Sequence, residues 1–211
     1  MDATQPAGSP TDRPAERPWM ARMPDAQRER MRRGEHPGDP RRLGSTVAVI
    51  GGVVFAWSYG DGVVDPTLLL VLRVLATAAA VYCLWRLYLR PVALGMPPQP
   101  HRFAWRIYLS SVVAMLVAIA LGRWLLASNG LEHAAPAWIA ACVGLHFLPF
   151  AWAFRERMLT LLGWAVGLTG LAGVALAIAL GAPWGDLGAI VAGLVQLGVI
   201  AAWASTARTA A

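Results

Sequence analysis

The stretch ACVGLHFLPF, residues 141–150, is apolar enough to lie in a lipid bilayer, yet it contains an ionisable histidine and a proline. The apolar run around it extends from Pro136 to Phe154, which is long enough for a helix that crosses a membrane. Pro149 has no backbone N–H, so the carbonyl of Leu145 is expected to lack its helical partner and the helix to bend. The stretch therefore predicts a membrane-spanning helix with a polar interruption at His146, near the bilayer centre.

The composition of the whole chain agrees with a membrane protein. Of the 211 residues, 57% are hydrophobic and 14% are charged, whereas about a quarter of the residues in soluble domains are charged. The apolar residues come in long runs, and such runs are typical of membrane spans. The sequence thus predicts an all-α fold, a polytopic bundle of six transmembrane helices in residues 43–206. The expected helices cover approximately residues 43–59, 66–90, 103–128, 136–154, 158–181 and 185–205.

The segments outside this domain are polar. Residues 1–42 are rich in proline, arginine and acidic residues, which predicts a disordered basic tail, and residues 207–211 form a second, short tail. An alternative for Pro24 to Arg33 is a short basic helix on the membrane surface or against a partner, with Met20, Met23 and Met31 on its apolar edge.

The placement of charge predicts the orientation. All 18 basic side chains are arginine, and sixteen of them lie in the tails or at one end of the expected helices. The three turns at the other end contain Asp61, Asp65, Glu132 and Asp186 but no arginine. Because arginines near helix ends are retained on the cytoplasmic side, both termini are predicted to be cytoplasmic. This arrangement argues against a nucleic-acid-binding face, in spite of the net charge of +6.

Motifs of soluble enzymes are absent from the sequence. It contains no phosphate-binding glycine loop, no HExxH, no GxSxG and no cluster of carboxylates with metal-ligand spacing. Cys83 and Cys142 lie within apolar runs, where a thiol packs as a small hydrophobic group. The sequence therefore predicts no cofactor, no metal site, no disulfide framework and no catalytic residue.

Polar side chains inside the expected spans are the candidates for a site, because they are costly in lipid. Counted from the outer helix ends, His146 and Gln196 lie roughly 15 Å deep and Arg73 roughly 10 Å deep. The three occur on helices that run in the same direction, so we expect that they can converge on a ligand or form a proton relay. The alternative for His146 is a hydrogen bond to a neighbouring helix that fixes the packing of the two helices. The same alternative applies to Gln196.

Arg73 and Arg123 both fall in the outer part of the membrane. Two guanidinium groups at this level predict an outward-facing site for an anion or a lipid headgroup. The alternative is structural ion pairing with acidic side chains of the outer turns, such as Asp61 or Glu132.

Small residues recur at helical spacing in the last two expected helices. Such residues let helices approach closely, which predicts tight packing within the chain or between subunits. The packing residues are Gly163, Gly167 and Gly170 in one helix and Gly185 and Gly193 in the other.

The run Gly144-Leu145-His146-Phe147-Leu148-Pro149-Phe150 resembles one in small multi-pass membrane proteins of bacteria that have no assigned activity. The resemblance implies a polytopic protein of the bacterial cell membrane and carries no activity with it. The arginine-only, alanine-rich composition also resembles that of a bacterium with a high GC content.

Three functions remain open at this point. The first is a transporter-like protein that binds or translocates a small solute or lipid through a polar interior around His146. The second is an accessory membrane subunit that packs against a partner protein or another copy through residues 158–181 and 185–205. The third is a membrane-embedded enzyme that acts on a lipid with His146 as base, for which no acid or nucleophile at matching depth is visible.

Overall fold

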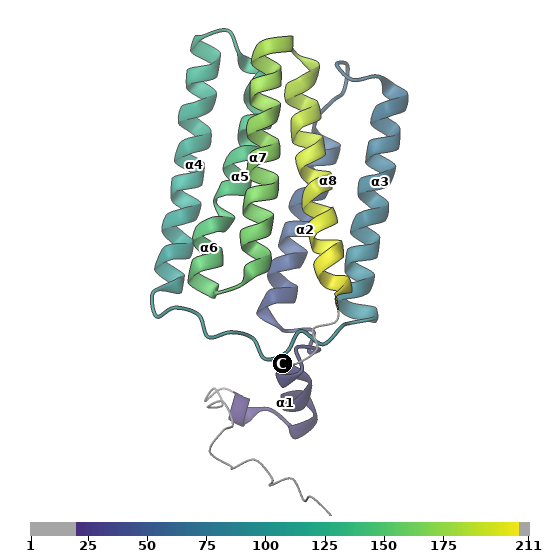
Figure 1. Cartoon of the computed structure of the whole chain (residues 1–211), viewed down its shortest axis with the longest axis vertical. Coiled ribbons are helices and arrows are strands. Elements are labelled where there is room, and N and C mark those ends of the chain that lie inside the picture. Colours follow the sequence, from purple (N-terminus) through teal and green to yellow (C-terminus); the bar gives the residue numbers. More distant parts are fainter. Residues whose placement is uncertain (1–19, 207–211) are drawn as a thin grey trace, which may run out of the picture.

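The computed structural model of the chain describes residues 20–206. In this part of the chain all regular secondary structure is helical and no strand is present, which confirms the predicted all-α class. Long helices stand side by side and alternate in direction, and a short helix, α1 (Asp25–Arg32), lies beyond one end of the bundle (Figure 1).

The observed helices lie close to the expected ranges, and α5 and α6 together occupy the fourth of them. Short 3₁₀ helices cover Met20–Arg22 (η2) and Glu132–Ala134 (η4), and a π-helix, η3 (Trp85–Leu89), extends α3. The helices of the bundle are α2 (Pro40–Ser58), α3 (Pro66–Leu84), α4 (Ala104–Ser128), α5 (Ala135–Leu145), α6 (Phe147–Phe154), α7 (Arg157–Leu180) and α8 (Pro183–Ser205).

Two helices of the bundle begin at an Asp-Pro pair. The carboxylate of Asp65 accepts a hydrogen bond from the backbone N–H of Leu68 at 2.9 Å, and Pro66 takes the first helical position of α3. Asp39 and Pro40 begin α2 in the same way. The aspartate satisfies an N–H that has no partner in the helix, and proline has no N–H to satisfy there.

Within residues 20–206, five helical segments are long and apolar enough to cross a membrane. The helix α2 is not one of them, because Arg41 and Arg42 lie in its first turn and lower its mean hydropathy. Length and composition therefore do not establish the sixth span expected at residues 43–59. The five segments are Pro66–Leu89, Ala104–Ser128, Glu132–Phe154, Arg157–Leu180 and Pro183–Ser205.

The outer surface of the bundle is apolar. Large side chains on three different helices are mostly exposed, for example Leu70 at 62%, Leu121 at 61% and Leu161 at 60%. Soluble monomers rarely expose contiguous apolar surface of this kind, whereas lipid tails cover it in a membrane protein. The surface thus agrees with the apolar composition of the helices.

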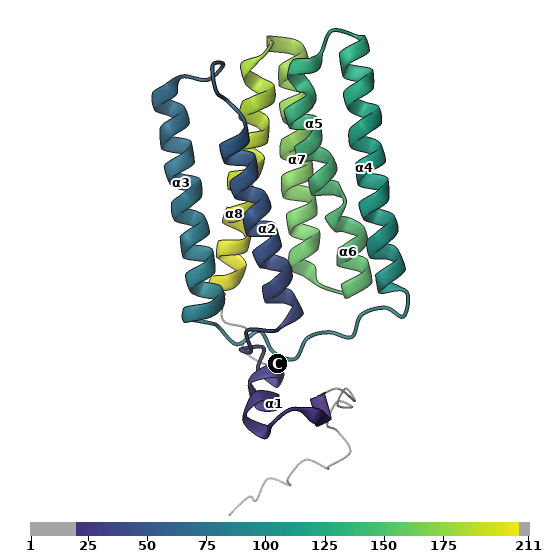
Figure 2. The same ribbon diagram turned by 180° about the vertical axis from the view of Figure 1, so that it is seen from behind.

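The bundle has two layers. The helices α7 and α8 form one layer, α2 and α5 with α6 form the other, and α3 and α4 lie at opposite edges (Figures 1 and 2).

Glycines join the layers, because they leave room for the backbones to approach. A Cβ atom on Gly144 of α5 would clash with the backbone of Gly167 on α7, and one on Gly170 would clash with that of Ala141. On α8, a Cβ on Gly193 would lie 2.6 Å from the carbonyl oxygen of Gly52 on α2.

The segment before α2 corrects one prediction. Residues 1–42 were expected to be disordered, but residues 20–42 contain η2, α1 and the start of α2, and Met20 and Met31 are buried. The expectation is therefore wrong for this part, while residues 1–19 and 207–211 lie outside the described residues. A basic helix in Pro24 to Arg33 was the alternative, and α1 falls within that range.

Two arginines explain the order of this segment. The guanidinium of Arg42, of which 1% is exposed, donates to the carbonyl oxygens of Gly34 at 2.6 Å, Leu87 at 2.6 Å and Val92 at 2.7 Å. Arg41 reaches the same loop through the carbonyl oxygen of Leu94 at 2.9 Å. Hydrogen bonds from a charged donor to buried carbonyls are strong, so they hold this polar segment together with the packing of Met20 and Met31.

The contact between Gly144 and Gly167 predicts a specific sensitivity. We expect Gly144→Ala to lower the free energy of unfolding by about 1–3 kcal/mol, because the added methyl group forces two helix backbones apart. The measurement is thermal unfolding of the detergent-purified protein, followed by circular dichroism. The matched control is Gly198→Ala on α8, where a Cβ has no atom within 4 Å and alanine improves helix propensity. Equal midpoints for the two variants would contradict the packing role.

Candidate functional site

His146 lies at a break between two helices. The helix α5 ends at Leu145, four residues before Pro149, and α6 begins at Phe147, two residues before it. Pro149 was expected to bend this span, because it lacks the N–H of a continuous helix. The Nδ1 atom of His146 donates a hydrogen bond to the carbonyl oxygen of Val143. A carbonyl oxygen only accepts, so a neutral ring carries its proton on Nδ1 and presents Nε2 as an acceptor.

The same break anchors α4. The hydroxyl of Ser111 donates to the backbone carbonyl oxygen of His146 at 3.0 Å. Tyr108 stacks on Phe150 of α6, with ring centroids 4.8 Å apart. Since α4 is otherwise mostly exposed, with Ala104 and Ser111 as its buried residues, these contacts hold an edge helix that has little apolar packing of its own.

The Nε2 atom of His146 has no hydrogen-bond partner among residues 20–206. The ring is partly buried and packs against Phe147 at 4.3 Å and Phe150 at 5.0 Å between centroids. The free nitrogen therefore lies beside aromatic rings within the span. No group of three or more metal-ligating side chains occurs in the described part of the chain.

Gln196 lies in a different environment. It is buried in α8, with 1% exposed, and its Nε2 donates to the carbonyl oxygen of Ala48 on α2. Its Oε1 atom is buried without a partner in the described residues. No hydrogen bond or ring contact joins Gln196 to His146, so similar depth in the membrane did not bring the two side chains together.

Arg73 is held at the outer end of α3. Its Nη2 atom donates to the carboxylate of Asp61 at 2.8 Å and to the carbonyl oxygen of Trp57 at 3.1 Å. The hydrogen bond from Arg73 holds the pKa of Asp61 below its usual value. These contacts match the alternative prediction, in which Arg73 forms a structural ion pair with an acid of the turns. No hydrogen bond joins Arg73 to His146.

Arg123 lies on α4, at the opposite edge of the bundle from α3 (Figures 1 and 2). It is exposed and makes no hydrogen bond or ion pair with another residue of the described chain. The structure therefore does not build the outer anion site expected from Arg73 and Arg123, because the two helices pack on different neighbours.

The glycines expected to mediate packing all face other helices of the same chain. On α7, Gly163 lies against Leu148 and Gly167 against Leu145, both from the broken span. On α8, Gly185 lies against the carbonyl of His133. Gly170 and Gly193 make the contacts with α5 and α2 described above. These faces are consequently not available to a partner protein.

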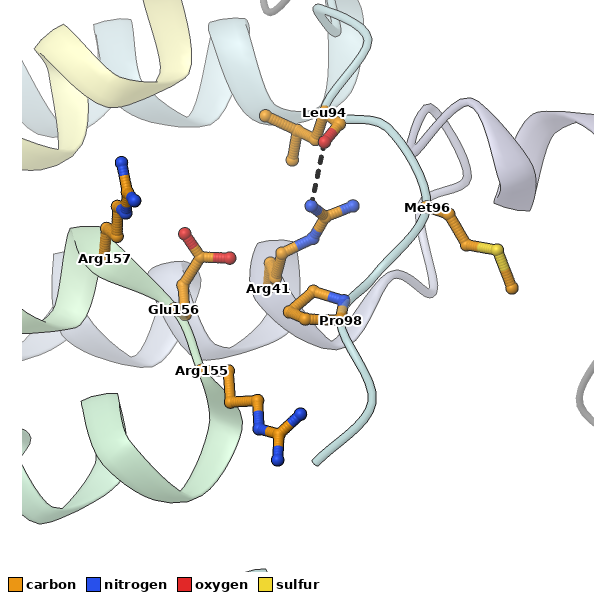
Figure 3. Close-up of a pocket in the computed structure, with 7 residues that line it drawn as sticks. All are labelled: Arg41, Leu94, Met96, Pro98, Arg155, Glu156 and Arg157. Atoms are coloured by element: carbon orange, nitrogen blue, oxygen red, sulfur yellow. Dashed lines mark hydrogen bonds between the residues drawn. The ribbon is translucent and has the colours of Figure 1, made fainter. Parts of the chain in front are cut away.

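A cavity at the arginine-rich end was not expected from the sequence. It has a volume of about 410 Å³ and lies between the start of α2, the loop after η3 and the turn that joins α6 to α7 (Figure 3). From the sequence, Arg155 and Arg157 count only among the sixteen arginines at the end predicted to be cytoplasmic. The sequence signal that could have indicated a site here is the non-helical turn between two spans, because it contains three charged residues in a row. The cavity is lined by Arg41, Leu94, Met96, Pro98, Arg155, Glu156 and Arg157.

Comparison with known proteins adds no assignment. The sequence matches no protein-family model, no curated protein and no solved structure. The functional argument therefore depends on the geometry of the two candidate sites, the break at His146 and the cavity at the arginine-rich end.

The pair of Arg73 and Asp61 predicts a loss of stability in acid. Because the folded pKa of Asp61 is lowered, the pair stabilises the fold above the unfolded pKa of about 3.9 and loses this contribution as the pH falls through the folded pKa. We expect Asp61→Asn to lower the unfolding temperature at pH 7 and to have a smaller effect near pH 3. Thermal unfolding across this pH range measures the difference. The control is Glu132→Gln, which removes an exposed acid at the same end; an equal pH dependence in both variants would contradict the pairing.

Proposed function

We propose that the protein is an integral membrane protein that crosses the membrane six times, with its arginine-rich end in the cytoplasm. Five helices have the required length and apolar character, and α2 runs beside them in the same bundle (Figure 1). The arginines that lower the hydropathy of α2 lie at its first turn, where backbone carbonyls bind them. The remainder of α2, from Leu43 onward, has the apolar surface of a short span.

This topology predicts that both termini lie on the same side of the membrane. We expect a green fluorescent protein fused after Ala211 to fluoresce, and an alkaline phosphatase at the same position to be inactive, because the C-terminus stays in the cytoplasm. An N-terminal epitope tag should be protected from protease in intact cells. With five crossings instead of six, the two termini would lie on opposite sides, and the tag and the fusion would report different compartments.

For the activity, we propose that the break between α5 and α6 binds a small solute or lipid through His146. One observation carries this proposal: Nε2 of His146 is an acceptor without a partner, beside two aromatic rings and near the middle of the span. An unpaired polar atom at this depth is costly unless it faces a ligand or water. A ligand with a hydrogen-bond donor and an apolar part fits both the nitrogen and the rings.

The other two functions have less support. Gln196 and Arg73 are bound elsewhere, so the proposed site consists of His146 and its aromatic neighbours rather than of three polar side chains. The glycine faces that would dock a partner subunit are occupied within the chain. A base needs a companion acid or nucleophile. No such side chain bonds His146 in the described residues, which favours binding over catalysis.

The site predicts a difference between two substitutions. Asparagine keeps a donor near the position of Nδ1, so His146→Asn should retain the bond to Val143 and the fold, but it removes Nε2. In a thermal-shift screen of alcohols, amines, fatty acids and lysolipids on the detergent-purified protein, we expect a compound that stabilises the wild type. The asparagine variant should lose that stabilisation while it unfolds near the wild-type temperature.

The control for this screen is Ser111→Ala, which removes the hydroxyl that anchors α4 and leaves Nε2 in place. We expect a lower unfolding temperature for this variant and an unchanged ligand effect. If His146→Asn retained the full ligand-induced shift, His146 would not be part of the site.

A further inference from the structure

We propose that the cavity at the arginine-rich end binds the headgroup of a phospholipid, with its phosphate at the rim beside Arg155 and its hydrogen-bond donors toward Glu156. This site is separate from His146 and does not depend on it. The cavity of about 410 Å³ is open and combines charged groups with apolar ones, Leu94, Met96 and Pro98 (Figure 3).

One arginine of the cavity is part of its wall. The guanidinium of Arg41 makes two hydrogen bonds to the carboxylate of Asp39, at 3.1 and 2.8 Å, and donates to the carbonyl oxygens of Leu94 and Gly95. Its side chain is 7% exposed. The carboxylate of Asp39 balances the charge of Arg41, and four hydrogen bonds occupy N–H donors of the guanidinium. Arg41 therefore fixes the loop, and an anion would have to bind to other residues.

The other two arginines are free to bind. Arg155 and Arg157 are exposed, and neither makes a hydrogen bond or ion pair with another residue in the range 20–206. They extend to opposite sides of the turn, with Glu156 between them (Figure 3). A guanidinium group binds phosphate oxygens through paired hydrogen bonds, so Arg155 at the rim fits a phosphate better than a lysine or an amide would.

The backbone at Arg155 is unusual. Its φ of 53° and ψ of 38° are left-handed, and it is the only non-glycine residue with positive φ in the described chain. It follows the last residue of α6, a position where glycine is the usual choice. Glycine adopts this conformation without steric cost, whereas an arginine adopts it against its conformational preference. A binding role for the side chain accounts for it.

The level of the turn suits a headgroup. Trp152 is 61% exposed near the end of α6, and exposed tryptophans of membrane proteins lie at the lipid–water interface. At a rise of 1.5 Å per residue, Arg155 lies roughly 5 Å beyond it, where lipid phosphates lie. The apolar side chains of Leu94 and Met96 offer a surface for the glycerol backbone of a lipid, which a free phosphate ion would not use.

Glu156 determines which headgroup fits. Its carboxylate is buried, with 5% of the residue exposed, and it is directed into the cavity (Figure 3). A carboxylate repels a second anion but accepts several hydrogen bonds, so it can bind hydroxyl or ammonium donors in addition to the contacts that it already makes. Phosphatidylglycerol supplies both a phosphate and such donors, whereas phosphatidylcholine has no donor to offer.

The test measures thermal unfolding of the full chain in a neutral detergent, with phosphatidylglycerol, phosphatidylcholine or inorganic phosphate added. We expect phosphatidylglycerol to raise the unfolding temperature and the other two to leave it unchanged. For Arg155→Gly we expect an unfolding temperature equal to or above that of the wild type without lipid, because glycine relieves the left-handed backbone. The same variant should need about tenfold more phosphatidylglycerol for the same shift, the loss expected for one charged hydrogen-bonding group.

Two further variants make the test decisive. Arg90→Gln removes an exposed arginine at the same end but outside the cavity, and it should retain the lipid response. Arg155→Gln keeps a polar side chain and should lose the response as Arg155→Gly does. Equal losses in Arg90→Gln and Arg155→Gln would show general attraction to charge and overturn the site. Stabilisation by inorganic phosphate alone, or equally by phosphatidylcholine, would overturn the assignment of the headgroup.

Discussion

The close approach of helix backbones at glycine is the constraint on which the bundle depends. In a lipid environment the tails are as apolar as leucine, so helices gain little from burying apolar side chains against each other. They gain instead from van der Waals contact between backbones, which requires residues without bulk. Gly144 with Gly167 joins α5 to α7, Gly173 with Gly188 joins α7 to α8, and Gly193 with Gly52 joins α8 to α2. A chain of such contacts connects both layers and leaves the large apolar side chains to face outward.

The edge helices are attached by a different means. The helix α4 has no glycine contact of this kind to the α5 and α6 backbones, and it is held through Ser111, Tyr108 and the Nε1 atom of Trp138, which donates to the carbonyl oxygen of Ala118 at 3.0 Å. The carbonyl oxygen that accepts the Ser111 bond belongs to His146, the residue at the break in the fourth span. One interruption of the fourth span thus has two consequences: it anchors a neighbouring helix, and it leaves a histidine nitrogen without a partner.

The sequence predicts those features that depend on neighbours along the chain. The all-α class, the cap at Asp65 and the bend before Pro149 follow from composition, capping chemistry and the missing N–H, and the structure has all three. The order of the helices around the bundle follows from contacts between distant residues, which no local pattern contains. His146 and Gln196 were expected to converge because of a similar predicted depth, yet their hydrogen bonds join different helices. The bonds of Arg42 to Leu87 and Val92, which lie 45 and 50 residues away along the chain, could not be predicted for the same reason.

The charged side chains at the two ends of the bundle make different contacts, and the proposed headgroup site depends on this difference. At the end predicted to lie outside, three of the four acids are engaged: Asp65 caps α3, Asp61 pairs with Arg73, and Asp186 accepts the backbone N–H of Gly60 at 2.8 Å. At the arginine-rich end, Arg41 and Arg42 are also engaged with carbonyls, but the turn between α6 and α7 presents exposed guanidinium groups beside an open cavity. The arginines at this end therefore form two groups: those whose hydrogen bonds hold the fold, and those that the proposed site assigns to a ligand. A rule that only counts arginines predicts the orientation, while the hydrogen bonds of each arginine show whether it holds the fold.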